Sequence, residues 1–216
     1  MIQTKNNSEQ SQPVSNLAAD NPLIDPKADR LGYTTFAGHL ADSICQMTVA
    51  KGFVITINGS LGSGKSTLLN FVTHYLQQKP EEEQPIVVPF NPWLFSGDEN
   101  ITKRFFDQLQ TVFSQSTSVP PDLKQRIADI AKVVSEIPLP FAQAGNAVAT
   151  LFDDDQKDTS DLKEEVEHKL IQKHSRIVVA IDDIDKLTAD EIRQLFRVIT
   201  AFPDFNNVVY LLVFDH

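Results

Sequence analysis

Hydrophobic residues along this chain fall into short continuous runs separated by stretches with helical spacing. Four continuous runs, rich in β-branched residues, predict strands: Phe53–Ile57, Ile86–Phe90, Ile177–Ile181 and Val208–Phe214. The runs do not alternate with polar residues, so both faces of the sheet should be covered, as in the parallel sheets of α/β proteins. Pro89 cannot donate a ladder hydrogen bond, which predicts that the second strand lies at a sheet edge.

Apolar residues that recur every three or four positions predict amphipathic helices between these strands. A first helix should end at Gly52. Its apolar face should consist of Phe36, Leu40, Ile44 and Met47. A second helix is expected from Lys65 to about Gln78. Another, over 188–202, begins with a capping box in which Thr188 faces Glu191.

Between the second and third strands the pattern predicts an all-helical insertion. Helical spacing occurs in three stretches, 101–113, 123–134 and 162–170. The uncharged run 137–152 is shorter than the roughly 20 apolar residues that span a bilayer. Prolines and amide side chains also interrupt it. We expect a packed or loosely held segment, with docking to a membrane surface or a partner as the alternative.

Length and composition favour one domain with a polar tail. Residues 1–28 are polar, contain three prolines and show no sustained period, so they predict a disordered tail, and residues 29–216 predict the domain. The formal net charge of -10 opposes binding to a phosphate backbone, so nucleic acid is not the expected partner.

The single cysteine, Cys45, excludes an internal disulfide and a cysteine-based zinc cage. It fits a reducing compartment, and the first twenty residues lack the apolar core of a secretory signal. We therefore expect a cytoplasmic protein. Peripheral association with the inner membrane face, through the run 137–152, is the weaker alternative.

A glycine-rich loop between the first strand and the second helix carries the strongest chemical signal. Residues 59–67, GSLGSGKST, match GxxxxGK[ST] in the strand–loop–helix context that this motif requires. Backbone N–H groups of such a loop surround phosphate oxygens at the positive end of a helix. The predicted nucleotide-binding residues are Gly59, Ser60, Gly62, Ser63, Gly64, Lys65, Ser66 and Thr67.

The same loop predicts the ligands ATP and Mg²⁺. Lys65 should reach the β- and γ-phosphates, and the Ser66 hydroxyl is an oxygen ligand of the kind Mg²⁺ prefers. GTP is disfavoured, because no Asn-Lys-x-Asp motif occurs in the chain.

Two carboxylates, Asp182 and Asp183, follow the third strand. We expect Asp182 to hold Mg²⁺ through water and Asp183 to orient or deprotonate the attacking water. A solvent-exposed turn without chemistry is the alternative. Asp185 and Lys186 could pair with each other or face a neighbouring subunit.

An aromatic segment follows the second strand. Trp93, with Phe90 and Phe95 nearby, predicts a cluster that anchors the helical insertion. Asn91 in the same segment is a candidate sensor near the γ-phosphate, or a residue of a partner surface.

Together these motifs resemble the KAP family of P-loop NTPases, which is related to signal-transducing ATPases and AAA-type proteins. The likeness covers about Asp29 to His216, and its specific parts are FNPWLFSGDEN (90–100) and IVVAIDDIDKL (177–187). It implies that Gly59, Gly64, Lys65, Ser66 and Thr67 bind nucleotide and Mg²⁺, and that Asp182 and Asp183 are the metal and catalytic acids. Family members commonly carry Arg at position 186 and Ala at position 92. Many also have transmembrane helices between the two nucleotide motifs.

The resemblance also implies a three-layer P-loop sandwich with sheet order 5-1-4-3-2. The run 208–214 then lies between 53–57 and 177–181, and Asp215 at its tip is a second candidate γ-phosphate sensor. The fifth strand is expected to be missing from this chain. We therefore expect a domain truncated at its C-terminus, with the first strand as an exposed apolar edge.

The predicted function is Mg²⁺-dependent ATP binding and hydrolysis, used as a conformational switch with a protein partner or in a homo-oligomer. Family likeness alone suggests a signalling or defence-type assembly. Two alternatives stay open. One is a nucleotide-gated interaction scaffold with negligible turnover, and the other is a P-loop kinase for a small molecule.

Overall fold

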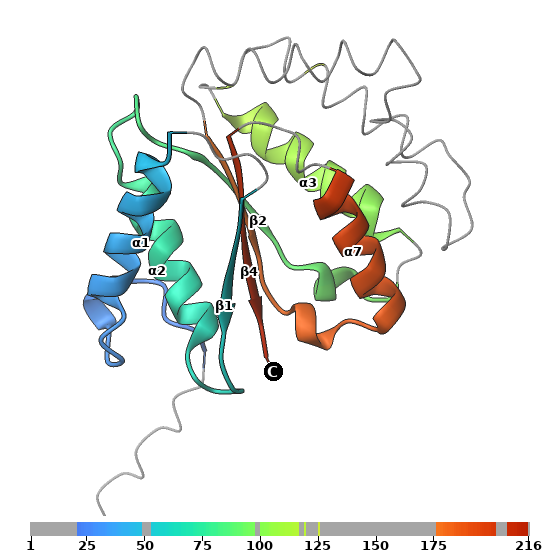
Figure 1. Cartoon of the computed structure of the whole chain (residues 1–216), viewed down its shortest axis with the longest axis horizontal. Helices are drawn as coiled ribbons and strands as arrows, with labels where there is room; N and C mark the ends of the chain where they lie inside the picture. The colour runs from blue at the N-terminus through green and yellow to red at the C-terminus, as the bar shows by residue number, and fades with distance from the viewer. Residues whose placement is uncertain are drawn as a thin grey trace, which may run out of the picture.

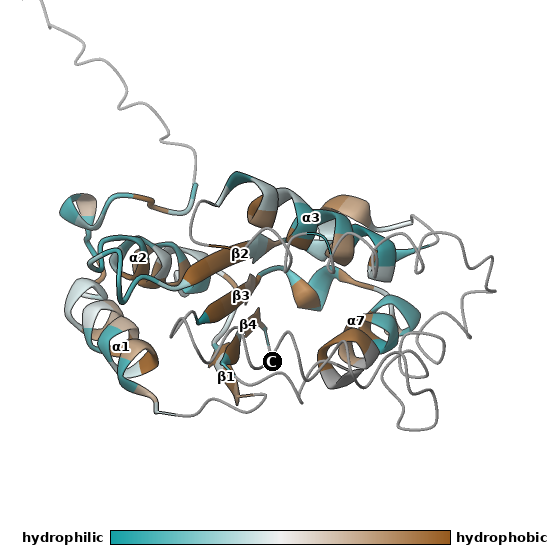
Figure 2. Ribbon diagram, turned by 90° about the horizontal axis from the view of Figure 1, so that it is seen from above, coloured by the Kyte–Doolittle hydropathy of each residue, from teal (hydrophilic) through white to brown (hydrophobic). Residues whose placement is uncertain are grey.

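The computed structural model describes residues 21–48, 53–97, 100–116, 176–201 and 207–215, together with Val119 and Gln125. Its strands form one parallel sheet of order β1-β4-β3-β2, seen near its strand ends in Figure 2. They are β1 (Phe53–Asn58), β2 (Ile86–Phe90), β3 (Ile177–Ile181) and β4 (Val208–Phe214). The α/β class is confirmed, as is the insertion of β4 between β1 and β3. The Pro89-bearing strand β2 lies at the edge, as predicted.

Helices cover both faces of the sheet, which makes three layers (Figure 1). One face carries α1 (Thr34–Gln46) and α2 (Lys65–Gln77), and the other carries α3 (Ile101–Gln115) and α7 (Ala189–Ala201). Side chains of the central strands alternate between the two cores. In β4, Val209, Leu211 and Val213 contribute to the α1–α2 core, and Val208, Tyr210 and Leu212 to the α3–α7 core. This explains why the strands are apolar throughout.

Helix α1 differs from its prediction in both its buried face and its end. Phe36 is 57% exposed, and the fully buried residues are Ala37, Ala41 and Ile44. Small side chains let α1 approach α2 closely, which residue spacing alone did not reveal. The helix ends at Gln46, where the buried Arg176 donates hydrogen bonds to the carbonyls of Ile44 and Met47. These bonds satisfy carbonyl groups that a helix end leaves without partners.

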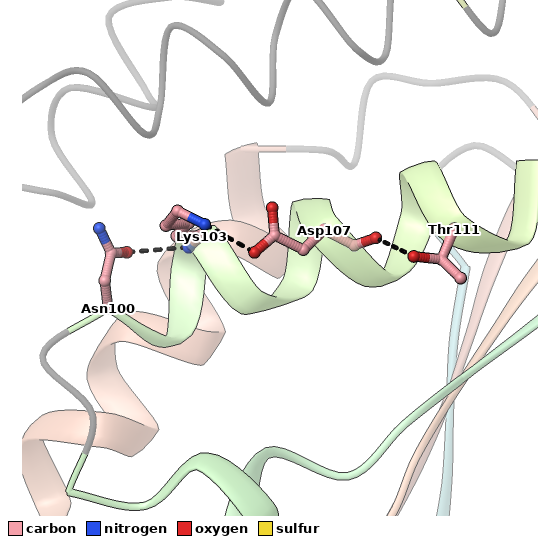
Figure 3. Close-up of polar contacts among 4 residues, drawn as sticks. All are labelled: Asn100, Lys103, Asp107 and Thr111. Atoms are coloured by element: carbon pink, nitrogen blue, oxygen red, sulfur yellow. Dashed lines mark hydrogen bonds and ion pairs between the residues drawn. The ribbon is translucent and has the colours of Figure 1, made fainter. Parts of the chain in front are cut away.

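Helix α3 is the described part of the predicted insertion. Its N-cap, Asn100, accepts a hydrogen bond from the Lys103 amide at 2.8 Å (Figure 3). On its outer side, Lys103 pairs with Asp107 at 2.8 Å, and the Thr111 hydroxyl donates to the Asp107 carbonyl. Apart from Gln125, the predicted helices at 123–134 and 162–170, and the run 137–152, lie outside the described residues. Within the described residues, no helix is long and apolar enough to cross a membrane.

The chain contacts the domain upstream of Asp29, the predicted domain start. The Leu23 amide donates to Thr67 Oγ1 at 3.1 Å, and the Leu23 carbonyl accepts from Asn70 Nδ2 at 3.0 Å. The short 3₁₀ helix η1 (Pro26–Ala28) follows, with Pro26 buried. Residues 21–28 therefore include contacts with α2, and residues 1–20 lie outside the described part.

Candidate nucleotide site

All the predicted site segments follow the carboxyl ends of the strands. The parallel register pairs Asn58 with Phe214 and Phe90 with Ile181, so the carboxyl ends of the strands lie together along one edge of the sheet, perpendicular to the edge strands. The glycine-rich loop follows β1, Asn91 follows β2, Asp182 and Asp183 follow β3, and the partly buried Asp215 follows β4. Ligands of open parallel sheets bind at this edge.

The glycines of the loop are required by its geometry. Gly62 and Gly64 have φ of +79° and +85°, a left-handed conformation that side chains disfavour. A Cβ on Gly64 would lie 2.5 Å from Leu31 Cδ1, and one on Gly59 would lie 2.7 Å from Ser63 Oγ. The loop is therefore a tight backbone turn, and a side chain at either position would require Leu31 or Ser63 to move.

Helix α2 begins directly after the loop and presents unpaired amides. Its first intrahelical bond runs from the Leu68 amide to the Gly64 carbonyl at 2.9 Å. The amides of Lys65, Ser66 and Thr67 precede this bond and have no carbonyl partner within the helix. With the helix dipole, they form an N-terminus suited to phosphate oxygens.

Lys65 lies folded across the loop. Its Nζ donates to the Gly59 carbonyl at 2.7 Å and to the Ser60 carbonyl at 3.1 Å. The Lys65 ammonium group thus lies against the loop. It is held by two neutral carbonyl groups that an anionic phosphate can replace.

The segment before β1 supports the loop from outside, and sequence reasoning missed these contacts. The Tyr33 hydroxyl donates to the Ser63 carbonyl at 2.6 Å, and the Tyr33 ring lies against Gly64. Thr67, a predicted nucleotide-binding residue, has its hydroxyl engaged by the Leu23 amide. Its backbone amide is one of the three amides of the first helical turn that have no carbonyl partner within the helix.

Asp29 holds this supporting segment in shape. Its carboxylate accepts hydrogen bonds from the amides of Leu31, Gly32 and Thr34 and from the Thr34 hydroxyl. The Thr34 hydroxyl bond is the largest cause of a pKa below the ordinary value for Asp29; burial, the next largest effect, raises the pKa, and the backbone bonds lower it again. Asp29 therefore fixes the turn that places Leu31 and Tyr33 beside the loop.

The two acidic residues after β3 have different partners. Asp182 Oδ1 accepts the Asp183 amide at 2.8 Å. Asp183 has a left-handed φ of 59°; its Oδ2 accepts from Asn91 Nδ2 at 2.7 Å, and its Oδ1 pairs with Lys186 Nζ at 2.7 Å. Lys186 therefore pairs with Asp183, and not with Asp185 as one prediction had it. Within the described residues, no hydrogen bond or ion pair joins either acid to the loop 59–67.

The aromatic segment after β2 separates into two parts. Phe90 and Phe95 stack at 6.2 Å, and Phe90 packs edge-on against Phe105 of α3. Trp93 was predicted to belong to this cluster but does not join it. It lies in the 3₁₀ helix η2 (Pro92–Phe95) and is 46% exposed. Its ring lies 4.8 Å from Lys186 Nζ.

The oxygen ligands and the phosphate-binding groups of this site fit a nucleotide with bound Mg²⁺. Ser66 at the start of α2 and Asp182 at the end of β3 offer oxygen atoms, the ligands that Mg²⁺ prefers. The tight glycine turn, the free helical amides and Lys65 fit the phosphates themselves. Among the described residues, these groups form a candidate anion site at the end of β1, and the acids lie at the end of β3, with β4 between the two strands.

Comparison with known proteins agrees with this geometry. A family model described as the KAP family P-loop domain matches residues 33–216. The chain is also 25% identical, over 226 aligned residues, to the Phage T7 exclusion protein of Escherichia coli (strain K12). That alignment covers 91% of this chain and 30% of the relative, so the chain spans under a third of the relative's length. With the family match extending over most of the sequence, the chain belongs to the KAP family of P-loop domains.

Proposed function

We propose that this domain binds ATP with Mg²⁺ at the loop 59–67 and hydrolyses its γ-phosphate. Family membership supports nucleotide binding. The single observation that carries hydrolysis is the position of Asp182 and Asp183 at the end of β3, on the same sheet edge as the loop. A P-loop with two acids at this edge has both the phosphate site and a candidate base for water.

Each residue has a distinct proposed role. Lys65 exchanges its contacts with the loop carbonyls for the β- and γ-phosphates, and the amides of α2 bind the phosphate oxygens. Ser66 and Asp182 hold Mg²⁺, which neutralises developing charge when it is bound. Asp183 orients or deprotonates the attacking water. Asn91 and Asp215 are proposed sensors of the γ-phosphate at the ends of β2 and β4.

Substitution of Lys65 tests the phosphate site. Lys65→Ala removes the side-chain charge from a site otherwise made of backbone amides, so we expect ATP affinity to fall about 10- to 100-fold. Calorimetric titration with Mg²⁺ and ATP measures this, and phosphate release measures hydrolysis. Lys27→Ala, an exposed lysine at η1, is the matched control. Unchanged affinity in Lys65→Ala would remove the basis for the proposal.

One observation favours a second candidate, a nucleotide-gated scaffold without appreciable turnover. Both carboxylate oxygens of Asp183 are engaged, by Asn91 and by Lys186. If this arrangement persists with ATP bound, the contacts with Asn91 and Lys186 restrict the movement of Asp183 toward the attacking water. Tight ATP binding without phosphate release would support this candidate over hydrolysis.

We place this activity in a defence-type switch with a protein partner or in a homo-oligomer. The support is the name of the relative, Phage T7 exclusion protein, together with family membership. Light scattering in ATP and in ADP tests the switch. A mass that changes with the nucleotide supports an assembly controlled by the γ-phosphate, and an identical mass contradicts the homo-oligomer.

A further inference from the structure

Four residues in or directly before η2 and η3 (Ile184–Lys186) form a closed set of contacts, here called the Asp183 cluster. Its members are Asn91, Trp93, Asp183 and Lys186. The Trp93 amide donates to Asn91 Oδ1 at 3.1 Å, and Asn91 Nδ2 donates to Asp183 Oδ2 at 2.7 Å. Lys186 Nζ pairs with Asp183 Oδ1 at 2.7 Å and lies 4.8 Å from the Trp93 ring centroid. Each member therefore contacts two others.

Lys186 is the charged link of the cluster. Its hydrogen bond to Asp183 raises the pKa of Lys186 above the ordinary value, so the ammonium stays charged at neutral pH. Its side chain is 42% exposed, and Trp93 is 46% exposed. Exposed ion pairs and exposed cation–π contacts are both weak, so this link can open without disturbing the core.

The contacts direct Asp183 toward η2 and η3. The left-handed φ of 59° and the two bonded oxygens hold the carboxylate on this side. A base that accepts a proton from water must have an oxygen within hydrogen-bond reach of that water. Each oxygen keeps a further lone pair, so Asp183 can still accept a proton, but only from water that its restrained carboxylate can reach.

We propose that Lys186 and Trp93 are positioning residues that hold Asp183 in a restrained state and thereby limit the rate of hydrolysis. Lys186 acts through Asp183, and Trp93 acts through Lys186, because its ring contacts the ammonium group. This inference rests on the proposed hydrolysis. It adds two residues that contribute to the rate without touching the nucleotide.

Substitutions that remove one contact at a time test the restraint. Lys186→Met keeps most of the aliphatic stem but removes the charge, and we expect kcat to rise about three- to tenfold with an unchanged KM for ATP. Trp93→Leu removes the aromatic face and should raise kcat by a smaller factor. The double variant should match Lys186→Met alone. Lys186→Arg, which keeps a cation able to stack on Trp93, should restore the low rate.

Two kinetic results would overturn the inference. A fall in kcat in Lys186→Met would mean that Lys186 assists the reaction. Effects of the two single variants that multiply in the double variant would mean that Trp93 does not act through Lys186.

Tryptophan fluorescence provides a readout without turnover. Trp93 is the only tryptophan of the chain, so its emission reports directly on the cluster. We expect emission and acrylamide quenching to change in Lys186→Met, and in Asp183→Asn, where Lys186 loses its counter-charge. Emission that is unchanged in both variants, in a protein that hydrolyses ATP, overturns this inference alone. A protein that responds in fluorescence but releases no phosphate overturns the proposed hydrolysis, and the rate restraint with it.

Discussion

Asp182 and Asp183 are adjacent in the chain but differ in their surroundings. Asp182 contacts the amide of its neighbour, whereas Asp183 contacts side chains from two other segments. In a strand exit, successive side chains point in different directions, so one acid can serve the metal and the other the water. The difference in roles is therefore testable one residue at a time.

At the residue scale we predict that Asp183→Asn keeps ATP binding and slows phosphate release about 10²- to 10⁴-fold, because an amide cannot accept the proton from water. Asp182→Asn should instead raise the Mg²⁺ concentration needed for tight binding. Titrations with ATP at several Mg²⁺ concentrations, together with phosphate release, separate the two effects. If Asp183→Asn is silent and Asp182→Asn stops hydrolysis, the assigned roles are reversed.

At the scale of elements, two helices begin with side-chain caps. Asn100 caps α3, and Glu191 forms a capping box with Thr188 at the start of α7. The Glu191 carboxylate also accepts hydrogen bonds from Ser96 and Gly97, so it ties α7 to the chain that leaves η2. The capping box, which the sequence predicts from nearby residues, thus also forms a contact between distant parts of the chain.

Loss of the α3 cap should be measurable in urea denaturation. We predict that Asn100→Ala lowers the free energy of unfolding by about 1 kcal/mol, because the Lys103 amide loses its acceptor. Lys103→Gln is the matched control. It removes an exposed pair with Asp107, and such pairs on a helix contribute only about 0.3–0.5 kcal/mol. Equal losses in the two variants would contradict the capping role.

Glu191 should make stability depend on pH. Burial raises the pKa of Glu191, but the hydrogen bonds from Gly97, Thr188 and Ser96 together lower it below the ordinary value of 4.5. A carboxyl whose pKa is depressed in the folded state stabilises the fold above its unfolded pKa, and this stabilisation is lost as pH falls through the folded value.

We therefore predict that Glu191→Gln is less stable than the natural chain at pH 7 and that the difference shrinks below about pH 4.5. Denaturant unfolding of both proteins at several pH values measures the difference. A constant difference across this range would show that Glu191 contributes by shape and not by charge.

At the scale of the whole molecule, the two edge strands of the described sheet, β1 and β2, differ from each other. Strand β1 pairs with β4 and with no other described strand, and Phe53 and Val54 are 47% and 42% exposed. An apolar strand edge with unpaired backbone groups promotes association between chains. At the opposite edge, Pro89 of β2 removes one donor.

We predict concentration-dependent self-association of this chain through β1. Val54→Lys places a charge on the edge strand and should reduce association, which sedimentation velocity at increasing concentration measures. Ile24→Lys is the control, because Ile24 is 75% exposed but lies before the sheet. Equal effects of the two lysines would point to general solubility and not to the strand edge.

Local signals in the sequence determined the strands, the loop 59–67, the capping box and the edge position of β2. Each depends on residues close together in the chain: β-branched runs, glycine spacing, a Thr–Glu pair and a proline. The family likeness added the sheet order. These predictions succeeded because backbone sterics and local hydrogen bonds act over a few residues.

Only the tertiary structure decided the partners of the side chains. Asn91 contacts Asp183 across 92 positions, and Leu23 contacts Thr67 across 44, and neither pair has a pattern in the sequence. The packing of α1 on α2 likewise buried Ala37 and Ala41 and left Phe36 exposed. Such contacts depend on how elements cross in space, which the period of hydrophobic residues does not specify. The sequence by itself thus located the glycine-rich loop 59–67 and the acids after β3, and the fold decided which side chains surround them.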